Sequence, residues 1–139
     1  MKTNLALCLL VLTMLMCVSC DPKKPESIAS DMMVRIAELE IEPSHFEEYK
    51  AILIEEAEAS VRLEPGVISI FPMFEIENPT QVRILEIYAN EEAYLSHLKT
   101  AHFEHYKTAT AKMVISLNIL DMDAMDTLTM SKIFKKVDL

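Results

Sequence analysis

The middle of the chain decides the fold, and its residues 63–90 read LEPGVISIFPMFEIENPTQVRILEIYAN. Val67 to Ile76 and Gln81 to Tyr88 are apolar runs of strand length, and the polar stretch between them favours a turn. We therefore predict a β-hairpin. Pro72 has no backbone N–H to donate to a sheet ladder, so its strand is expected to lie at a sheet edge or to contain a bulge.

An amphipathic helix is predicted immediately before this hairpin, over residues 45–63. Pro43 suits the first turn of a helix, where a missing N–H costs no intrahelical hydrogen bond. Pro65 cannot continue the helix, and Gly66, the only glycine of the chain, can take a left-handed turn conformation. The helical period assigns Phe46, Tyr49, Leu53, Ala57 and Val61 or Ser60 to the apolar face, and Glu47, Glu48, Lys50, Glu55, Glu56 and Glu58 to the polar face.

The same periodicities predict the elements on either side. A strand is predicted over residues 32–41, with Arg35, Ala37 and Leu39 on one face. Two helices are predicted over residues 91–98 and 101–112, with Asn90 and Thr100 as their N-caps. A last strand is predicted over residues 113–121. Residues 130–137 suit either a short strand or a tail. The order β-α-β-β-α(α)-β is typical of a ferredoxin-like α+β fold, an antiparallel sheet with its helices on one face. The other face would stay apolar and uncovered, so we expect a homodimer.

The N-terminus has the pattern of an export signal. Lys2 precedes an almost unbroken apolar run from Leu5 to Val18, which is shorter than the roughly 20 residues of a membrane-spanning helix. Ser19 and Cys20 end this run in a pattern that resembles a bacterial lipobox. We predict a signal peptide over residues 1–19, a lipidated Cys20 and tether over 20–31, a domain over 32–125 and a C-terminal extension over 126–139. Plain secretion and a retained anchor are the alternatives to a lipid-anchored protein of the cell envelope.

Composition and charge exclude several classes of function. The formal net charge is −9, and loss of Lys2 with the leader makes it −10, which argues against nucleic acid as a partner because phosphates call for Lys and Arg surfaces. Cys8, Cys17 and Cys20 are the only cysteines, so the predicted domain has no thiol nucleophile, Cys-ligated zinc or Fe–S cluster. The sequence also has neither a dinucleotide-binding fingerprint nor a phosphate loop.

Three segments together resemble the antibiotic biosynthesis monooxygenase (ABM) family of dimeric α+β barrels. They are Ile41-Glu42-Pro43 leading into the helix that ends Leu63-Glu64-Pro65-Gly66-Val67-Ile68-Ser69, the strand Arg83-Ile84-Leu85-Glu86-Ile87-Tyr88, and Asn90-Glu91-Glu92-Ala93-Tyr94-Leu95-Ser96-His97 followed by Ala101-His102-Phe103. The resemblance covers residues 32–122. It implies enzymes that oxidise quinols or polyketide phenols with O2 and without a bound metal or flavin. A deprotonated phenol passes an electron to O2 directly, so the protein needs a dry pocket, a base and donors for the developing anion.

Three residues are candidates for the catalytic roles. His97 and His102 match histidine positions of the family, and either one serves as the base for a phenolic proton or stabilises the turn between two helices. Tyr88 either lines the pocket mouth as a hydrogen-bond donor or merely ends its strand.

Three further residues are candidates for substrate contact. Glu86 is either an acid of the pocket or a buried carboxylate paired with Arg83 or Arg35. Asn118 orients a substrate carbonyl or bonds to a neighbouring backbone group. Phe103 contacts the substrate or belongs to the core or interface.

We predict neither a metal nor an organic cofactor. His97, His102 and His105 could be imagined around an ion, but their spacing is no metal-site signature and the helix offers other reasons for histidine. Haem-degrading enzymes of the same fold place their axial His at the position of Lys107 and a Trp near His97, whereas this chain has no Trp.

These features leave two main hypotheses and one further option for the function. The first is a cofactor-independent monooxygenase in the cell envelope that acts on a small aromatic molecule. The second is a non-catalytic ligand-binding or dimeric scaffold domain, and an isomerase or dehalogenating activity is a third option. The first predicts a pocket into which His97, His102 or Tyr88 points. The second predicts a pocket filled by Phe and Met.

Overall fold

The computed structural model describes residues 31–126, 129 and 132. Its elements, in chain order, are β1 (Met33–Ile41), the short 3-10 helix η2 (Pro43–His45), α1 (Phe46–Leu63), β2 (Val67–Phe74), β3 (Gln81–Tyr88), α2 (Glu91–His97), α3 (Ala101–Thr110) and β4 (Val114–Met122). The predicted elements are confirmed, with small differences at their ends. For example, β2 stops at Phe74 rather than Ile76, and α3 stops at Thr110 rather than Lys112.

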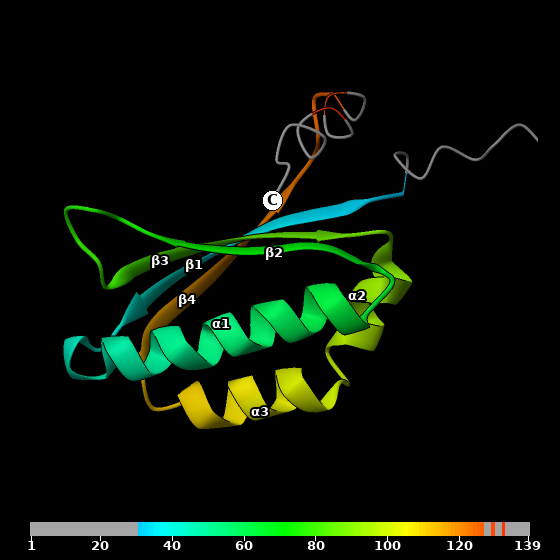
Figure 1. Ribbon diagram of the computed structural model, residues 1–139. Helices are drawn as coiled ribbons and strands as arrows, with labels where there is room; N and C mark the ends of the chain where they lie inside the picture. The colour runs from blue at the N-terminus through cyan, green and yellow to red at the C-terminus, as the bar shows by residue number, and fades with distance from the viewer. Residues whose placement is uncertain (1–30, 127–128, 130–131, 133–139) are drawn as a thin grey trace, which may run out of the picture.

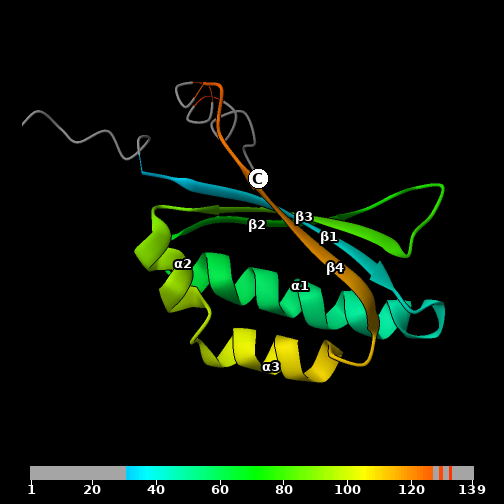
Figure 2. The same cartoon turned by 180° about the vertical axis from the view of Figure 1, so that it is seen from behind.

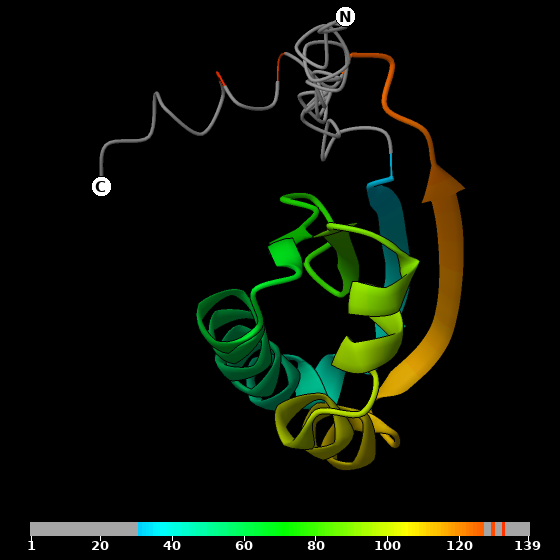
Figure 3. The same ribbon diagram turned by 90° about the vertical axis from the view of Figure 1, so that its right-hand side faces the viewer.

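The four strands form one antiparallel sheet in the order β2-β3-β1-β4. The helices lie together on one face of this sheet, as seen from the front and from behind (Figures 1 and 2). The end view shows β4 at the outer margin, away from α1 (Figure 3). This arrangement is the ferredoxin-like α+β fold that the sequence predicts. The edge position of β2 also confirms the interpretation of Pro72.

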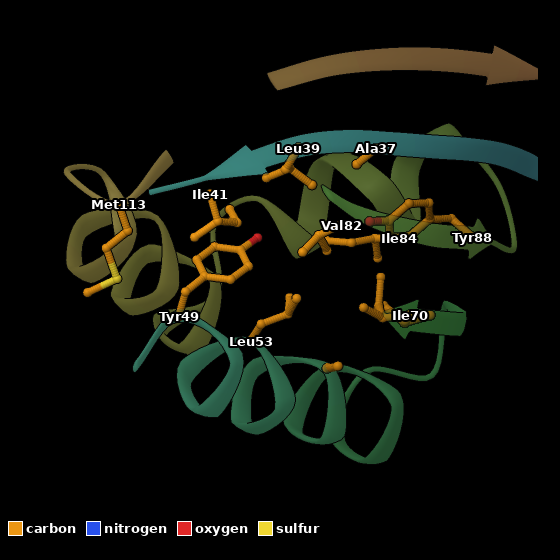
Figure 4. Packing of buried hydrophobic residues seen from close by; sticks show 12 residues of the cluster. Ala37, Leu39, Ile41, Tyr49, Leu53, Ile70, Val82, Ile84, Tyr88 and Met113 are labelled. Carbon is orange, nitrogen blue, oxygen red and sulfur yellow. The ribbon is translucent and has the colours of Figure 1, made fainter. Parts of the chain in front are cut away.

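The hydrophobic core lies between α1 and the helix-facing side of the sheet. Ala37 pairs with Ile84 and Leu39 with Val82 across β1 and β3, so these side chains share one face. Tyr49 reaches towards them from α1 and is fully buried (Figure 4). The alternation read from the first strand is therefore confirmed.

The buried face of α1 agrees with the prediction except at Glu56. Ser60 is fully buried while Val61 is exposed, which decides between the two alternatives. Glu56 was expected on the polar face, but the structure buries it. The prediction was wrong because Glu56 follows Tyr49 by two helical turns and precedes Ser60 by one, so it lies in the same stripe.

Gly66 does not use the left-handed conformation that is open to it, because no residue in the described part of the chain has a positive φ. The glycine is needed for space instead. A Cβ at Gly66 would lie 2.4 Å from the Cβ of Ala93 on α2. The Gly66 carbonyl also accepts a hydrogen bond from the backbone N–H of Ala89 at 2.8 Å. The turn after α1 therefore packs directly against α2, which positions the site described below.

Several sequence predictions concern residues outside the described part of the chain. The predicted signal peptide, Cys20 and nearly all of its tether lie outside the described residues, as does almost all of the segment 130–137. Among the residues that are described, no helix has the length and apolar character needed to cross a membrane.

Candidate active site

A cavity of about 550 Å³ lies between the helix-facing side of the sheet and the helices. Its apolar walls include Leu39, Leu53, Ile70, Ile84 and Phe103, and its polar lining consists of Arg35, Glu56, Glu86, Tyr88, Tyr94, His97, Tyr106, Lys107 and Thr110. Leu117 and Ile119 of β4 also line the cavity and are exposed, so the cavity reaches the surface beside this strand.

His97 is the buried histidine of this cavity, with only 2% of its surface exposed. It ends α2, while Glu64 is the C-cap residue of α1, and the close approach of the two helices brings their side chains together. One oxygen of Glu64, Oε1, lies 3.0 Å from His97 Nδ1 and 2.5 Å from His102 Nε2. Burial alone would raise the pKa of Glu64, but the hydrogen bonds from both histidines outweigh it and lower that pKa.

The Glu64 carboxylate fixes the tautomer of His97. An ionised carboxyl group only accepts hydrogen bonds, so His97 donates from Nδ1. In the neutral imidazole the lone pair is then on Nε2, the atom that can take up a proton. Glu64 thus holds the ring in one orientation and would stabilise the imidazolium, as the aspartate does in a Ser-His-Asp triad.

Glu56 faces His97 from α1. Its Oε1 lies 3.7 Å from His97 Nε2, which is longer than a hydrogen bond, and accepts a hydrogen bond from Ser60 Oγ at 2.8 Å. Burial raises the pKa of Glu56, although Ser60 and His97 pull the pKa in the opposite direction. The carboxyl group therefore keeps its proton to a higher pH than an exposed glutamic acid does.

Glu86 and Tyr88 form a second polar pair at the cavity wall. Tyr88 Oη donates to Glu86 Oε2 at 3.1 Å, and burial raises the pKa of both groups, so the hydroxyl stays a neutral donor. Arg35 is the cross-strand partner of Glu86 on β1. Its guanidinium lies 4.7 Å from the centre of the Tyr94 ring, and its Nε donates to Asp121 at 2.8 Å.

A pair of tyrosine hydroxyls lies deeper between α1 and α3. The hydroxyl oxygens of Tyr49 and Tyr106 are 2.8 Å apart, and Tyr106 lines the cavity. Burial raises the pKa of Tyr106 to about 12, so both phenols stay neutral and hydrogen-bonded at physiological pH.

The structure brings most, but not all, of the predicted site residues together. Those that line the cavity are His97, Tyr88, Glu86 and Phe103. His102 does not line it, and contacts His97 through the shared Glu64 oxygen. Asn118 requires a correction, because its side chain lies on the opposite face of the sheet and donates to Glu38 at 3.0 Å. Leu117 and Ile119 take the cavity side of β4 instead, since side chains alternate along a strand.

Sequence reasoning missed two functional candidates and left one pairing open. Glu56 had a usable signal in its helical spacing from Tyr49 and Ser60, whereas Glu64 was read only as part of a helix stop. The open pairing was that of Glu86, for which Arg35 is the cross-strand partner. Arg83 was the other suggested partner, and it forms ion pairs with Glu38 and Glu75 instead.

Glu64, His97 and His102 also form the one group of three metal-ligating side chains in the described part of the chain whose ligand atoms lie within 4.8 Å of one another. The hydrogen bonds to Glu64 Oε1 already engage all three groups, and an ion would have to displace the protons of both imidazoles. The prediction that the protein works without metal or organic cofactor stays a prediction.

The model of the family described as antibiotic biosynthesis monooxygenase matches residues 32–109, more than half of the chain. The chain belongs to the antibiotic biosynthesis monooxygenase family. The resemblance read from the sequence is thereby confirmed, and no curated protein matches this ABM protein.

Solved structures agree with the family. A protein of Bacteroides thetaiotaomicron VPI-5482, provisionally named an antibiotic biosynthesis monooxygenase, is 47% identical over 70% of this chain and 93% of its own, with a TM-score of 0.70. A provisionally named monooxygenase of Lactobacillus acidophilus NCFM is 30% identical over 66% of this chain and 43% of its own, with a TM-score of 0.64. A Nitrosomonas europaea protein, 21% identical over 69% of this chain and 92% of its own with a TM-score of 0.65, shares the fold.

Proposed function

We propose that this ABM protein is a cofactor-independent monooxygenase that oxidises a small phenol- or quinol-type aromatic molecule with O2. The observation that carries the proposal is the buried His97, whose Nδ1 is held by the Glu64 carboxylate and whose Nε2 faces a cavity residue, Glu56. Membership of the family supports the reaction class. A non-catalytic domain with a filled pocket fits less well, because the cavity is open and both His97 and Tyr88 line it.

In this proposal His97 Nε2 removes the proton of a phenolic hydroxyl group. The Glu64 carboxylate stabilises the resulting imidazolium, since it already accepts the Nδ1–H hydrogen bond. The electron-rich phenolate passes one electron to O2, and the two radicals combine to form a C–O bond. Tyr88 turns its single O–H donor from Glu86 to an anionic substrate oxygen, and the hydroxyl stays neutral because burial raises the pKa of Tyr88.

The size and lining of the cavity support the substrate class. Its volume of about 550 Å³ falls within the range of roughly 300–1,000 Å³ that small-molecule sites occupy. Its aliphatic and aromatic walls suit the faces of one or two fused rings, while His97, Tyr88 and Glu86 supply polar groups to the lining.

Oxygen consumption tests the proposal. The purified protein is incubated with a panel of hydroquinones and 1-naphthols under air and under nitrogen, and O2 uptake is followed together with quinone absorbance. His97→Gln should lower kcat by roughly 100-fold or more, since it removes the general base. His105→Gln changes an exposed histidine of α3 and should leave kcat unchanged. Uptake by the wild type no greater than that of the His97 variant would contradict the proposal.

We also propose that a second copy of the chain covers the helix-free face of the sheet. A continuous apolar row crosses this face, because Phe71 pairs with Leu85, Leu85 with Ile36, and Ile36 with Leu120. Phe71 on β2 is 57% exposed and Leu120 on β4 is 39% exposed, so the row leaves large apolar side chains in contact with solvent at both of its ends. Sedimentation should give a dimer, and a monomer at all concentrations would exclude this interface.

The proposed location is a membrane surface of the cell envelope, with the domain tethered through a lipid on Cys20. The support is the leader pattern described above, which ends at Ser19-Cys20. Metabolic labelling of the full chain with a radioactive fatty acid should mark the protein, and Cys20→Ser should abolish the label. Equal labelling of both forms would exclude this anchor.

A further inference from the structure

Glu56 is a buried titratable group that the proposed reaction leaves unused. It is 5% exposed, it lines the same cavity as His97, and its Oε1 lies 3.7 Å from the Nε2 atom that takes the substrate proton. We propose that Glu56 is a second catalytic residue, an acid that protonates the oxygen adduct of the substrate and then recovers a proton from His97. This inference rests on the proposed monooxygenase function.

The reaction needs an acid as well as a base. When a phenol with a free para C–H bond becomes a quinone, one O2 is consumed and one water is formed. The phenolic proton and the ring C–H proton both end on the departing oxygen. Combination of the aryloxyl radical with superoxide at the para carbon gives a peroxide anion. This anion must be protonated before its O–O bond can break, because hydroxide is a far better leaving group than oxide.

Glu56 can supply both protons if His97 returns a proton to its carboxylate after each transfer. Its carboxyl group protonates the peroxide anion. The resulting carboxylate attracts the His97 imidazolium, whose Nε2 lies 3.7 Å away in the structure without substrate, and takes the phenolic proton from it once the two groups close to hydrogen-bond distance. His97 is again a base and removes the ring C–H proton. The O–O bond breaks, the quinone carbonyl forms, and the leaving hydroxide takes the proton of Glu56 to become water. A second transfer from His97 to Glu56 restores the starting state, so atoms, electrons and protons balance.

The surroundings of Glu56 suit this role better than those of the other acids in the cavity. Glu86, the other carboxyl group that lines the cavity, already accepts the Tyr88 hydroxyl and has Arg35 as its cross-strand neighbour, and no ion pair or hydrogen bond joins it to His97 in the described part of the chain. Glu56 has a neutral donor, Ser60, and its ion-pair partner within the described residues is His97. An acid whose nearest charge partner is the catalytic base exchanges protons with that base.

The protonation of Glu56 responds to every titratable group around it. The groups that interact with it are His97, His102, Glu64, Glu86, Tyr49, Tyr88 and Tyr106. Burial and the acidic neighbours favour the protonated form, and the two histidines oppose it. The protonated form is the one that the acid role requires.

Two measurements on the full chain test the inference. Carbon-13 NMR of the glutamate-labelled protein, with Glu56→Gln used to assign the signal, should show a neutral Glu56 carboxyl group at neutral pH. Oxidation of 1-naphthol, followed by O2 uptake, should show kcat lowered roughly 100-fold in Glu56→Gln with KM little changed. The alkaline limb of the wild-type pH–rate profile, which reports ionisation of the acid, should disappear in that variant.

Glu58→Gln is the matched control, because Glu58 lies on the same helix and pairs with Arg62 on the surface. It should keep both the wild-type kcat and the alkaline limb. A Glu56 carboxyl group that is ionised at neutral pH, or a Glu56→Gln enzyme with wild-type kcat and pH profile, would overturn the inference while leaving the monooxygenase function intact. Absence of O2 uptake in the wild type across the panel would instead remove the function itself, and the role of Glu56 with it.

Discussion

Replacing Glu64 with glutamine should loosen the junction between α1 and the helices α2 and α3. One oxygen of Glu64 accepts hydrogen bonds from His97 and His102, and the exposed fractions of the three side chains are 12%, 3% and 21%. Hydrogen bonds to a charged group are worth about 1.5–3 kcal/mol, and those to a neutral group about 0.5–1.5 kcal/mol. Exchanging the carboxylate for an amide should therefore cost about 1 kcal/mol per bond, or about 2 kcal/mol of unfolding free energy in total.

The loss should also depend on pH, because the pKa of Glu64 is lowered in the folded protein. A carboxyl group whose folded pKa lies below its unfolded pKa contributes stability above the unfolded value. That contribution is lost as the pH falls through the folded value. The difference between wild type and Glu64→Gln should therefore be constant near neutral pH and begin to shrink below about pH 4.3, the ordinary pKa of glutamic acid.

Urea unfolding, followed by circular dichroism over a series of pH values, measures both effects. Glu58→Gln serves as the control, since its surface pair with Arg62 is worth roughly 0.5 kcal/mol or less. The reasoning would be refuted if Glu64→Gln unfolded at the wild-type urea concentration near neutral pH. It would be refuted equally by a stability difference that stayed the same throughout the acid range.

Three further changes test other parts of the structure. Gly66→Ala should cost about 1–3 kcal/mol of stability, because its Cβ would lie 2.4 Å from that of Ala93, and adding Ala93→Gly should restore part of the lost melting temperature. Tyr49→Phe should cost about 1 kcal/mol, since Tyr106 loses its hydroxyl partner, and an unchanged Tm would contradict this. Glu86→Gln should gain stability relative to the wild type as the pH rises. Burial raises the pKa of Glu86, so the wild type loses stability as the pH rises from the unfolded to the folded pKa of this carboxyl group. Urea midpoints of both proteins at about pH 5 and about pH 8 measure the difference.

The fold was readable from the sequence because its signals are local. Strand alternation, the helix stop before Val67 and the caps at Asn90 and Thr100 all depend on neighbouring residues, and both caps form with hydrogen bonds from the N–H groups of Ala93 and Phe103. The role of Gly66 was misread, since the backbone conformation is ordinary and the constraint is the approach of a helix from another part of the chain.

The site was only partly readable, because its decisive contacts are long-range. The pairing of Glu64 with His97 joins residues that are 33 positions apart, and no local sequence pattern predicts it. The sequence left the face of Asn118 undecided, because the faces of β4 depend on its register with β1, which shifts between Glu40 and Ile41. Glu56 looked like a solvent-exposed charge on a helix with many acidic residues, although its spacing already placed it in the buried stripe.

His97, oriented by Glu64, should take up a phenolic proton inside the cavity, and the proposed mechanism depends on this step. Absorbance titration with 4-nitrophenol measures it without turnover, because the phenol and the phenolate absorb at different wavelengths. At a pH well below the pKa of the free probe, the wild type and His105→Gln should bind the phenolate, and His97→Gln should bind the neutral phenol. A neutral phenol bound to the wild type, or equal phenolate in the His97 variant, would contradict the assignment of the base.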